Sequence, residues 1–192
     1  NTGYFGGGSP TSSTMDKVVY LTDTTAAVPS ANLSLARPNL AATGSSTAGY
    51  FAGGPTPGNY YSTMDKITYS TDTTVRTPGA ALNQARATLA ATGNSTAGYF
   101  GGGSTASTVN VSRMDKVTYA TDTTAATPGA NLSAARGYLA ATSSSTAGYF
   151  GGGINAGPSP NLLYSTMDKV TYSTDTTAAV PGARLTGARI KL

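Results

Sequence analysis

Four copies of one repeat make up the sequence, and this repetition limits the possible folds more than any other feature. Three markers recur in the same order: a Gly-Tyr-Phe segment followed by small residues, a Met-Asp-Lys segment and an Ala-Arg pair. The Gly-Tyr-Phe segments lie at 3–5, 49–51, 98–100 and 148–150. The Met-Asp-Lys segments lie at 15–17, 64–66, 114–116 and 167–169, and the Ala-Arg pairs at 36–37, 85–86, 135–136 and 188–189. Four copies with a period of roughly 50 residues predict an array or a propeller rather than a domain with one central core.

Length variation within the repeat is confined to one connection. The separation from Met to Arg is 22 residues in every copy (15 to 37, 64 to 86, 114 to 136 and 167 to 189). The separation from the last Gly of the small-residue run to Met is instead 7, 10, 11 and 14 residues (8 to 15, 54 to 64, 103 to 114 and 153 to 167). Segments of constant length are typical of a packed scaffold, whereas a connection of variable length is typical of exposed surface.

Each repeat contains four short segments with the composition of β-strands. In the second repeat these are residues 40–43, 48–53, 65–71 and 74–77. Thr, Ser, Ala, Gly and Tyr dominate the chain, Glu is absent and only 10% of the residues are charged, so helices are disfavoured. Four strands in a repeat of this length fit a propeller blade. We therefore expect an all-β fold, a β-propeller of four blades with four strands each.

The aromatic strand and the Met-Asp-Lys strand are expected to supply the packing between blades. In the strand that begins at Asp65, period-2 alternation places Ile67 on the same face as Asp65, with Lys66 on the other. The residues expected to be buried between blades are Tyr4, Phe5, Phe51, Phe100 and Phe150, with Val18, Ile67, Val117 and Val170.

The order of these markers resembles the kelch repeat. The last copy carries Arg136, the strand 139–142, then Tyr149-Phe150-Gly151-Gly152, and a later strand with Val170 and Tyr172. The resemblance covers essentially the whole chain, but kelch blades usually carry a Trp after the third strand, and this chain has no Trp. The resemblance implies kelch-like blades whose loops between the second and third strands project on one face.

We expect a single repeat domain over residues 1–192. Its blades cover approximately residues 1–35 together with 185–192, then 36–84, 85–134 and 135–184. Because the chain begins at the second strand of a repeat and ends on the approach to a first strand, we expect the N- and C-terminal strands to pair. Residues near 190–192 would then lie beside Gly3–Gly6 and close a ring of four blades. The alternative is that the chain is an excerpt of a longer array.

The composition excludes most catalytic and metal-binding chemistry. The chain has no His and no Cys, so Ser-His-Asp and Cys-His arrangements and ordinary zinc or copper sites are excluded. The glycine runs are not followed by Gly-Lys-Ser/Thr, and one Asp per strand rarely holds a hard cation. The net charge of +4 comes from scattered basic residues, and no apolar run reaches about 18 residues. We therefore expect no enzymatic activity, no cofactor, no metal, no nucleic-acid partner and no membrane insertion.

The recurring charged residues are expected to have structural roles. Asp in Met-Asp-Lys would cap a turn or bond neighbouring backbone while the Lys faces water, and Asp in Thr-Asp-Thr-Thr would form a turn. Each recurring Arg would tie adjacent blades together by bonding carbonyls or an Asp, because its rigid donor fork suits that task.

The variable connections are the best candidates for a binding function. They comprise residues 9–12, 55–61, 104–111 and 154–164. Tyr, Asn and Pro in these loops are residue types that stack on sugars or pack at interfaces. The candidate ligand-binding residues are Asn59, Tyr60, Tyr61, Asn110, Asn161 and Tyr164. Plain solvated loops are the alternative interpretation.

Two segments of the repeat are similar to repeats in structural proteins of marine bacteriophages, especially those of cyanobacteria. These segments are Tyr-Phe-Gly-Gly-Gly and Met-Asp-Lys-Val-Thr-Tyr-Ser-Thr-Asp-Thr-Thr. This resemblance implies a virion, tail-fibre or other extracellular location. We expect a non-enzymatic adhesive or structural module that binds through its variable loops. Its partners would be a host-surface glycan or protein, or other virion subunits. The alternatives are a self-assembling scaffold without a ligand and a propeller enzyme such as a lyase or a glycosidase.

Overall fold

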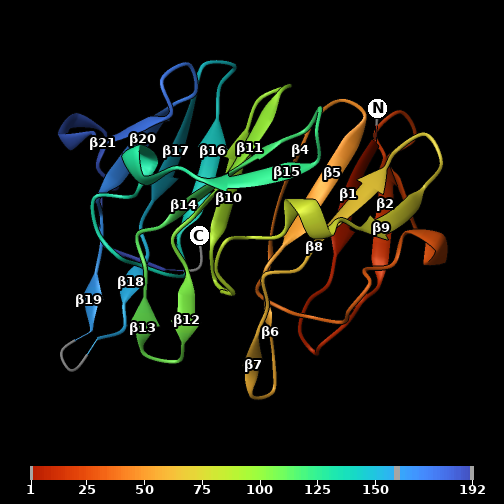
Figure 1. Ribbon diagram of the computed structural model, residues 1–192, viewed down its shortest axis with the longest axis horizontal. Coiled ribbons are helices and arrows are strands. Elements are labelled where there is room, and N and C mark those ends of the chain that lie inside the picture. Colours follow the sequence, from red (N-terminus) through yellow and green to blue (C-terminus); the bar gives the residue numbers. More distant parts are fainter. Residues whose placement is uncertain (1, 158–160, 191–192) are drawn as a thin grey trace.

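The computed structural model describes residues 2–157 and 161–190 and shows an all-β chain (Figure 1). The described part contains no α-helix. Its helical elements are four short 3-10 helices, each beginning at a Pro that follows the last strand of a sheet. They are η1 (Pro29–Ala31), η2 (Pro78–Ala80), η3 (Pro128–Ala130) and η4 (Pro181–Ala183).

Three four-stranded antiparallel sheets follow one another along the chain, and each is called a blade here. Blade 2 contains β4 (Ala41–Gly44), β5 (Ala48–Ala52), β8 (Met64–Thr68) and β9 (Thr73–Arg76). Blade 3 contains β10 (Ala90–Gly93), β11 (Ala97–Gly101), β14 (Met114–Thr118) and β15 (Thr123–Ala126). Blade 4 contains β16 (Ala140–Ser143), β17 (Ala147–Gly151), β20 (Met167–Thr171) and β21 (Thr176–Ala179). The expectation of four-stranded antiparallel blades is confirmed for these three repeats, and the arrangement is consistent with a β-propeller.

Blade 1 has three strands rather than four. It consists of β1 (Thr2–Gly6), β2 (Met15–Val19) and β3 (Thr24–Ala27), and β1 pairs with β2 alone among the described residues. The expected partner of β1, near residues 190–192, falls partly on residues 191 and 192, which lie outside the described residues. Ile190 itself is in a bend. Closure of a four-blade ring therefore stays a prediction.

The register within a blade gives its two faces different chemistry. In blade 2, Phe51 lies opposite Asp65 while Tyr50 lies opposite Lys66, so alternation sends the two pairs to opposite faces. The face that carries the Phe, called the Phe face here, packs against the preceding blade. The face that carries the Tyr, called the Tyr face, packs against the following blade.

The core is a set of clusters between successive blades. Phe51 and Ile67 pack with Met15 of blade 1, and Phe100 and Val117 pack with the Tyr face of blade 2. Six of the nine residues expected between blades are fully buried: Phe51, Phe100, Phe150, Ile67, Val117 and Val170. Tyr4 and Val18 are half-buried.

The expectation for Phe5 is wrong, because this side chain is 69% exposed. It lies on the Phe face of blade 1, and no blade of the described chain precedes blade 1. Figure 1 shows blade 1 and blade 4 at opposite ends of the row, on the right and on the left of the view.

The glycine runs form tight turns where each aromatic strand ends. Gly54 has a φ of +97°, and a Cβ there would lie 2.6 Å from the carbonyl oxygen of Pro38. A side chain at this position would therefore be strained by the backbone and would collide with the preceding connection.

Each described variable connection of blades 2, 3 and 4 contains a small hairpin. The hairpin strands are β6 (Pro55–Thr56) with β7 (Asn59–Tyr60), β12 (Ser104–Ala106) with β13 (Val109–Asn110), and β18 (Ile154–Asn155) with β19 (Leu162–Leu163). All three hairpins project from the same edge of the row, the lower edge in Figure 1. We call this edge the hairpin rim.

Candidate functional site

The recurring arginines hold the connections between blades in place. Arg37 is fully buried, and its Nη2 donates hydrogen bonds to Asp65 Oδ2 at 2.9 Å and to the carbonyl oxygen of Phe51 at 3.2 Å. The same contacts recur at Arg86 with Asp115 and at Arg136 with Asp168. Burial lowers the pKa of Arg86 from its ordinary value, and the Asp115 carboxylate opposes this shift. The expected tying role of Arg is confirmed for Arg37, Arg86 and Arg136.

The role expected for Asp in Met-Asp-Lys needs correction. Asp65 lies inside β8 and is fully buried in an ion pair with Arg37, rather than capping a turn. It also accepts a hydrogen bond from the backbone N–H of Ser34, as part of the expected backbone bonding. A buried carboxylate needs such partners because the charge has lost its water.

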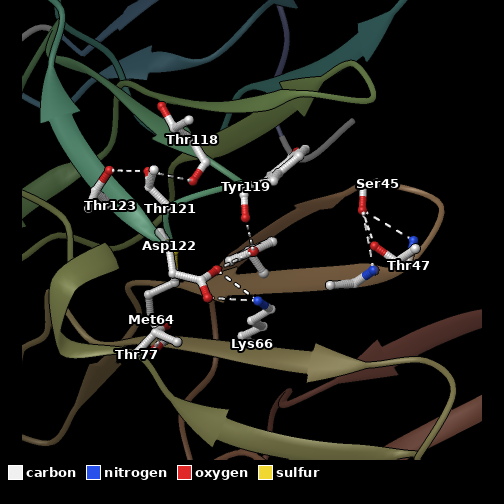
Figure 2. Close-up of polar contacts among 12 residues, drawn as sticks. Ser45, Thr47, Met64, Lys66, Thr77, Thr118, Tyr119, Thr121, Asp122 and Thr123 are labelled. Atoms are coloured by element: carbon white, nitrogen blue, oxygen red, sulfur yellow. Dashed lines mark hydrogen bonds and ion pairs between the residues drawn. The ribbon is translucent and has the colours of Figure 1, made fainter.

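A second polar cluster joins the Tyr face of each blade to a turn of the next blade. Asp122 has a φ of 50° in the turn between β14 and β15, and its carboxylate accepts hydrogen bonds from Lys66 Nζ at 2.7 Å and Tyr50 Oη at 2.5 Å (Figure 2). Burial raises the pKa of Asp122, but the Lys66 and Tyr50 bonds outweigh burial and lower it overall. The turn role of this Asp is confirmed, whereas Lys66 does not simply face water as expected.

Two of the loop candidates support the scaffold. Asn110 Nδ2 donates to Ser104 Oγ at 2.8 Å, and Asn110 Oδ1 accepts from the backbone N–H of Ala156 at 2.6 Å, so Asn110 joins neighbouring hairpins. The guanidinium of Arg136 lies over the ring of Tyr164, 5.5 Å from its centroid. Both side chains therefore have contacts within the chain, and their role in ligand binding stays a prediction.

The other four candidates do not form one site. Asn59 and Asn161 are exposed, and Tyr60 and Tyr61 are half-buried. Tyr61 Oη accepts a hydrogen bond from Thr56 Oγ1 at 3.3 Å within its own connection. Asn161 belongs to a different blade from the other three, so the structure distributes the candidates along the hairpin rim instead of gathering them in one pocket.

An open polar depression of about 490 Å³ lies at the base of the β12–β13 hairpin. Its lining residues are Gln84, Asn110, Val111, Ser112, Arg113, Pro128, Asn131 and Ala135. Arg113 is half-buried and forms no ion pair with the described residues. Arg113 and Gln84 offer donors suited to hydroxyl or anionic groups of a ligand.

Sequence reasoning missed both Gln84 and Arg113, although a usable signal was present. At the position of Arg113, the other copies have Thr14, Thr63 and Thr166. At the position of Gln84, they have Leu35, Ala134 and Gly187. Arg113 therefore replaces a Thr that the other three copies share, whereas the position of Gln84 holds a different residue in every copy; both residues line the same depression.

The described residues contain neither a membrane-spanning helix nor a cluster of metal-ligating side chains. Within 2–157 and 161–190, no helix is long and apolar enough to cross a membrane. In the same part of the chain, no group of three or more potential metal-ligating His, Cys, Asp or Glu side chains occurs.

Comparison with known proteins identifies a similar fold but no family. No family model matches the chain, and no curated protein matches it. A solved structure described as "Structure of YjhT" is similar with a TM-score of 0.78 at 12% sequence identity. The similarity covers 98% of this chain and 64% of that chain, so this chain spans less than two thirds of that structure's length. At this identity the similarity shows the fold alone.

Proposed function

We propose that the chain is a kelch-like propeller module without catalytic activity that binds through the hairpin rim. In this proposal it is an adhesive or structural part of a virion or another extracellular assembly, and its partner is a surface glycan. A host protein or another subunit of the assembly is the alternative partner. The observation that carries the proposal is that length variation, and the replacement of a repeated Thr by Arg113, occur along the hairpin rim while the contacts between blades repeat.

The chemistry of the depression supports a polar, extended ligand. Arg113 and Gln84 provide hydrogen-bond donors, and exposed Asn59 and half-buried Tyr60 lie on the rim at the neighbouring blade. Sugars are bound by such combinations of hydrogen-bonding groups and aromatic faces. The depression is open rather than enclosed, which favours a surface chain of sugars over a small molecule that must be buried on most sides.

The placement of the carboxylates supports a binding role over a glycosidase. Glycoside hydrolysis needs two carboxylates on either side of the scissile bond. Asp115 is fully buried against Arg86, Asp122 is bonded to Lys66 and Tyr50, and no Asp lines the depression.

A glycan array probed with the 192-residue chain tests the proposal. The informative variants are Arg113→Thr and Gln84→Ala, because each installs a residue that another repeat already has at that position. We expect Arg113→Thr to weaken binding of the captured glycan at least about tenfold, as for loss of a charge-assisted hydrogen bond, and Gln84→Ala to weaken it about threefold or more, as for loss of a neutral one. The melting temperature should not change in either variant.

The matched control is Arg76→Ala. Arg76 is exposed at the end of β9, and the corresponding residue is Ala126 in blade 3 and Ala179 in blade 4. It removes one positive charge from a residue that does not line the depression, so binding should not change. An array without a bound glycan, or equal binding by Arg113→Thr and the parent chain, would contradict a glycan as the partner.

A further inference from the structure

Each interface between successive blades is built from the same set of complementary groups. The Phe face contributes a Phe ring, an Asp that pairs with the Arg of the preceding connection, and a turn whose Asp pairs with a Lys of the preceding blade. The Tyr face contributes an apolar hollow, a Lys and a Tyr ring. At the two ends of the row of blades, each of these groups lacks, among the described residues, the group that it contacts at the inner interfaces.

The unmatched apolar features are the Phe5 ring on blade 1 and a hollow on blade 4. Phe5 on blade 1 is 69% exposed, whereas the corresponding Phe51, Phe100 and Phe150 are at most 4% exposed. Blade 4 carries an open hollow of about 180 Å³ on its Tyr face, lined mainly by Ala140, Thr142, Tyr149, Gly151, Met167 and Leu185. At the preceding interface the equivalent space is occupied, since Phe150 packs with Met114, Leu132 and Leu139. An apolar cavity of roughly 150 Å³ is enough to hold a benzene ring.

The unmatched charges have opposite signs at the two ends. Asp16 and Asp23 on blade 1 form no ion pair with the described residues, and neither do Lys169 and Arg189 at blade 4. Within the chain the corresponding residues are paired, as Asp65 is with Arg37. The backbone N–H and carbonyl of Arg189 already bond Tyr164 and Gly153, so the base of this side chain is anchored to blade 4.

The tyrosines repeat the same pattern. Tyr4, Tyr50 and Tyr99 each stack on a Tyr of the following blade, with ring centroids 4.9 to 5.1 Å apart. Tyr149 is the corresponding residue on blade 4, and Tyr20, which is 59% exposed, is the corresponding outer ring on blade 1. Neither has a stacking partner among the described residues.

We propose that the Phe face of blade 1 docks on the Tyr face of blade 4 of a second copy of this chain. Phe5 enters the hollow beside Met167, Asp16 pairs with Arg189, and Asp23 pairs with Lys169. The partner is a second copy because this chain supplies both halves of every contact with matching charge and shape, and three interfaces within it already show how the halves fit. The contact joins unlike surfaces head to tail, so each copy of a dimer keeps one free end, and further copies can add unless a ring closes. This inference goes beyond the rim-binding proposal and does not depend on it.

Sedimentation velocity of the 192-residue chain over about 1 to 200 μM tests the proposal. The average molar mass of the parent protein should increase as its concentration rises, because self-association follows mass action. Phe5→Ala should weaken self-association at least about 30-fold, the size expected for a central interface residue. Ala140→Phe should do the same by filling the hollow, because the corresponding Ala90 packs in the same cluster as Phe150. The control Val109→Ala shortens an exposed side chain on the hairpin rim and should leave association unchanged.

Mixing the two variants gives the sharpest result. A Phe5→Ala chain keeps its hollow and an Ala140→Phe chain keeps its ring, so an equimolar mixture should form a one-to-one dimer that neither variant forms alone. A parent chain that stays monomeric at every concentration overturns the proposal. The chain has no other Cys, so the rate of thiol labelling of a Phe5→Cys variant then reports whether position 5 is accessible. Fast labelling shows a free end, and slow labelling shows that the two ends pair within one chain. Association that Phe5→Ala leaves unchanged also overturns it.

Discussion

Arg86 Nη1 donates a hydrogen bond to Asp115 Oδ2 over 2.7 Å, although both side chains are fully buried. The backbone N–H of Arg86 bonds the carbonyl of Tyr61 in the connection of blade 2, while its Nη2 donates to the carbonyl of Phe100 in blade 3. One residue therefore links two blades through its backbone and its side chain. The arrangement explains why the distance from Met to Arg is constant in all four copies.

Removal of the negative charge from this pair should destabilise the protein strongly. Asp115→Asn leaves the Arg86 charge buried without compensation, and we expect a loss of about 3–5 kcal/mol in the free energy of unfolding. Asp122→Asn, at a carboxylate that is 37% exposed and bonded to Lys66, should cost about 1 kcal/mol or less. Urea denaturation of both variants measures the difference, and similar small losses would show that the buried pair is not important for stability.

The aromatic side chains should differ in their contribution to stability according to their blade. Phe100→Ala removes a ring that is 0% exposed, so we expect a loss of roughly 3–5 kcal/mol. Phe5→Ala, at a ring that is 69% exposed, should change the stability of the dilute monomer by about 0.5 kcal/mol at most. Thermal unfolding at low protein concentration provides the measurement. A large effect of Phe5→Ala in the monomer would mean that blade 1 is covered.

Small residues should be required where two blades come closest. A Cβ at Gly98 would lie 2.3 Å from Thr43 Cγ2 of the preceding blade, so Gly98→Ala should cost about 1–3 kcal/mol through overpacking. At Gly182 an added Cβ would meet no atom within 4 Å, and Gly182→Ala should be neutral or slightly stabilising. Circular dichroism melts of the two variants compare these outcomes, and equal melting temperatures would contradict the close approach of the blades.

Stability should be nearly constant from about pH 5 to 9 and should fall on both sides. The hydrogen bond from Lys17 lowers the pKa of Asp72, so the folded state gains stability above the unfolded Asp pKa of about 3.9 and loses it as the pH falls through the folded value. Burial raises the pKa of Tyr119 to about 12, so its contribution is complete below about pH 10 and is lost as the pH rises toward 12. The chain has no His, and we therefore expect no step in the neutral range.

Urea midpoints from pH 3 to 11 would measure this profile. The Asp72→Asn variant should lose part of the acid-side fall and keep the alkaline fall. A steep change in the midpoint between pH 6 and 8 would disagree with the structure.

Most of the blade architecture was predictable because strand and turn preferences act locally. The four strands of the second repeat were placed within about two residues at most ends, and burial of Ile67 and Phe51 followed from alternation. The candidate site was less predictable. Sequence reasoning found the variable connections, but it did not foresee that Asn110 and Tyr164 also contact the scaffold. It missed Arg113, which stands out only by comparison with the other copies.

The sequence by itself determined the repeat, its strands, its turns and the location of its variable loops, because these depend on neighbours along the chain. Only the tertiary structure decided which charges pair and which aromatic rings are buried. Phe5 and Phe51 occupy the same position in the repeat, yet one is exposed and the other buried, since burial depends on whether another blade covers that face. The same reasoning holds for Asp16 and Asp65: a carboxylate gains its partner only when the arginine of a preceding connection reaches it through space.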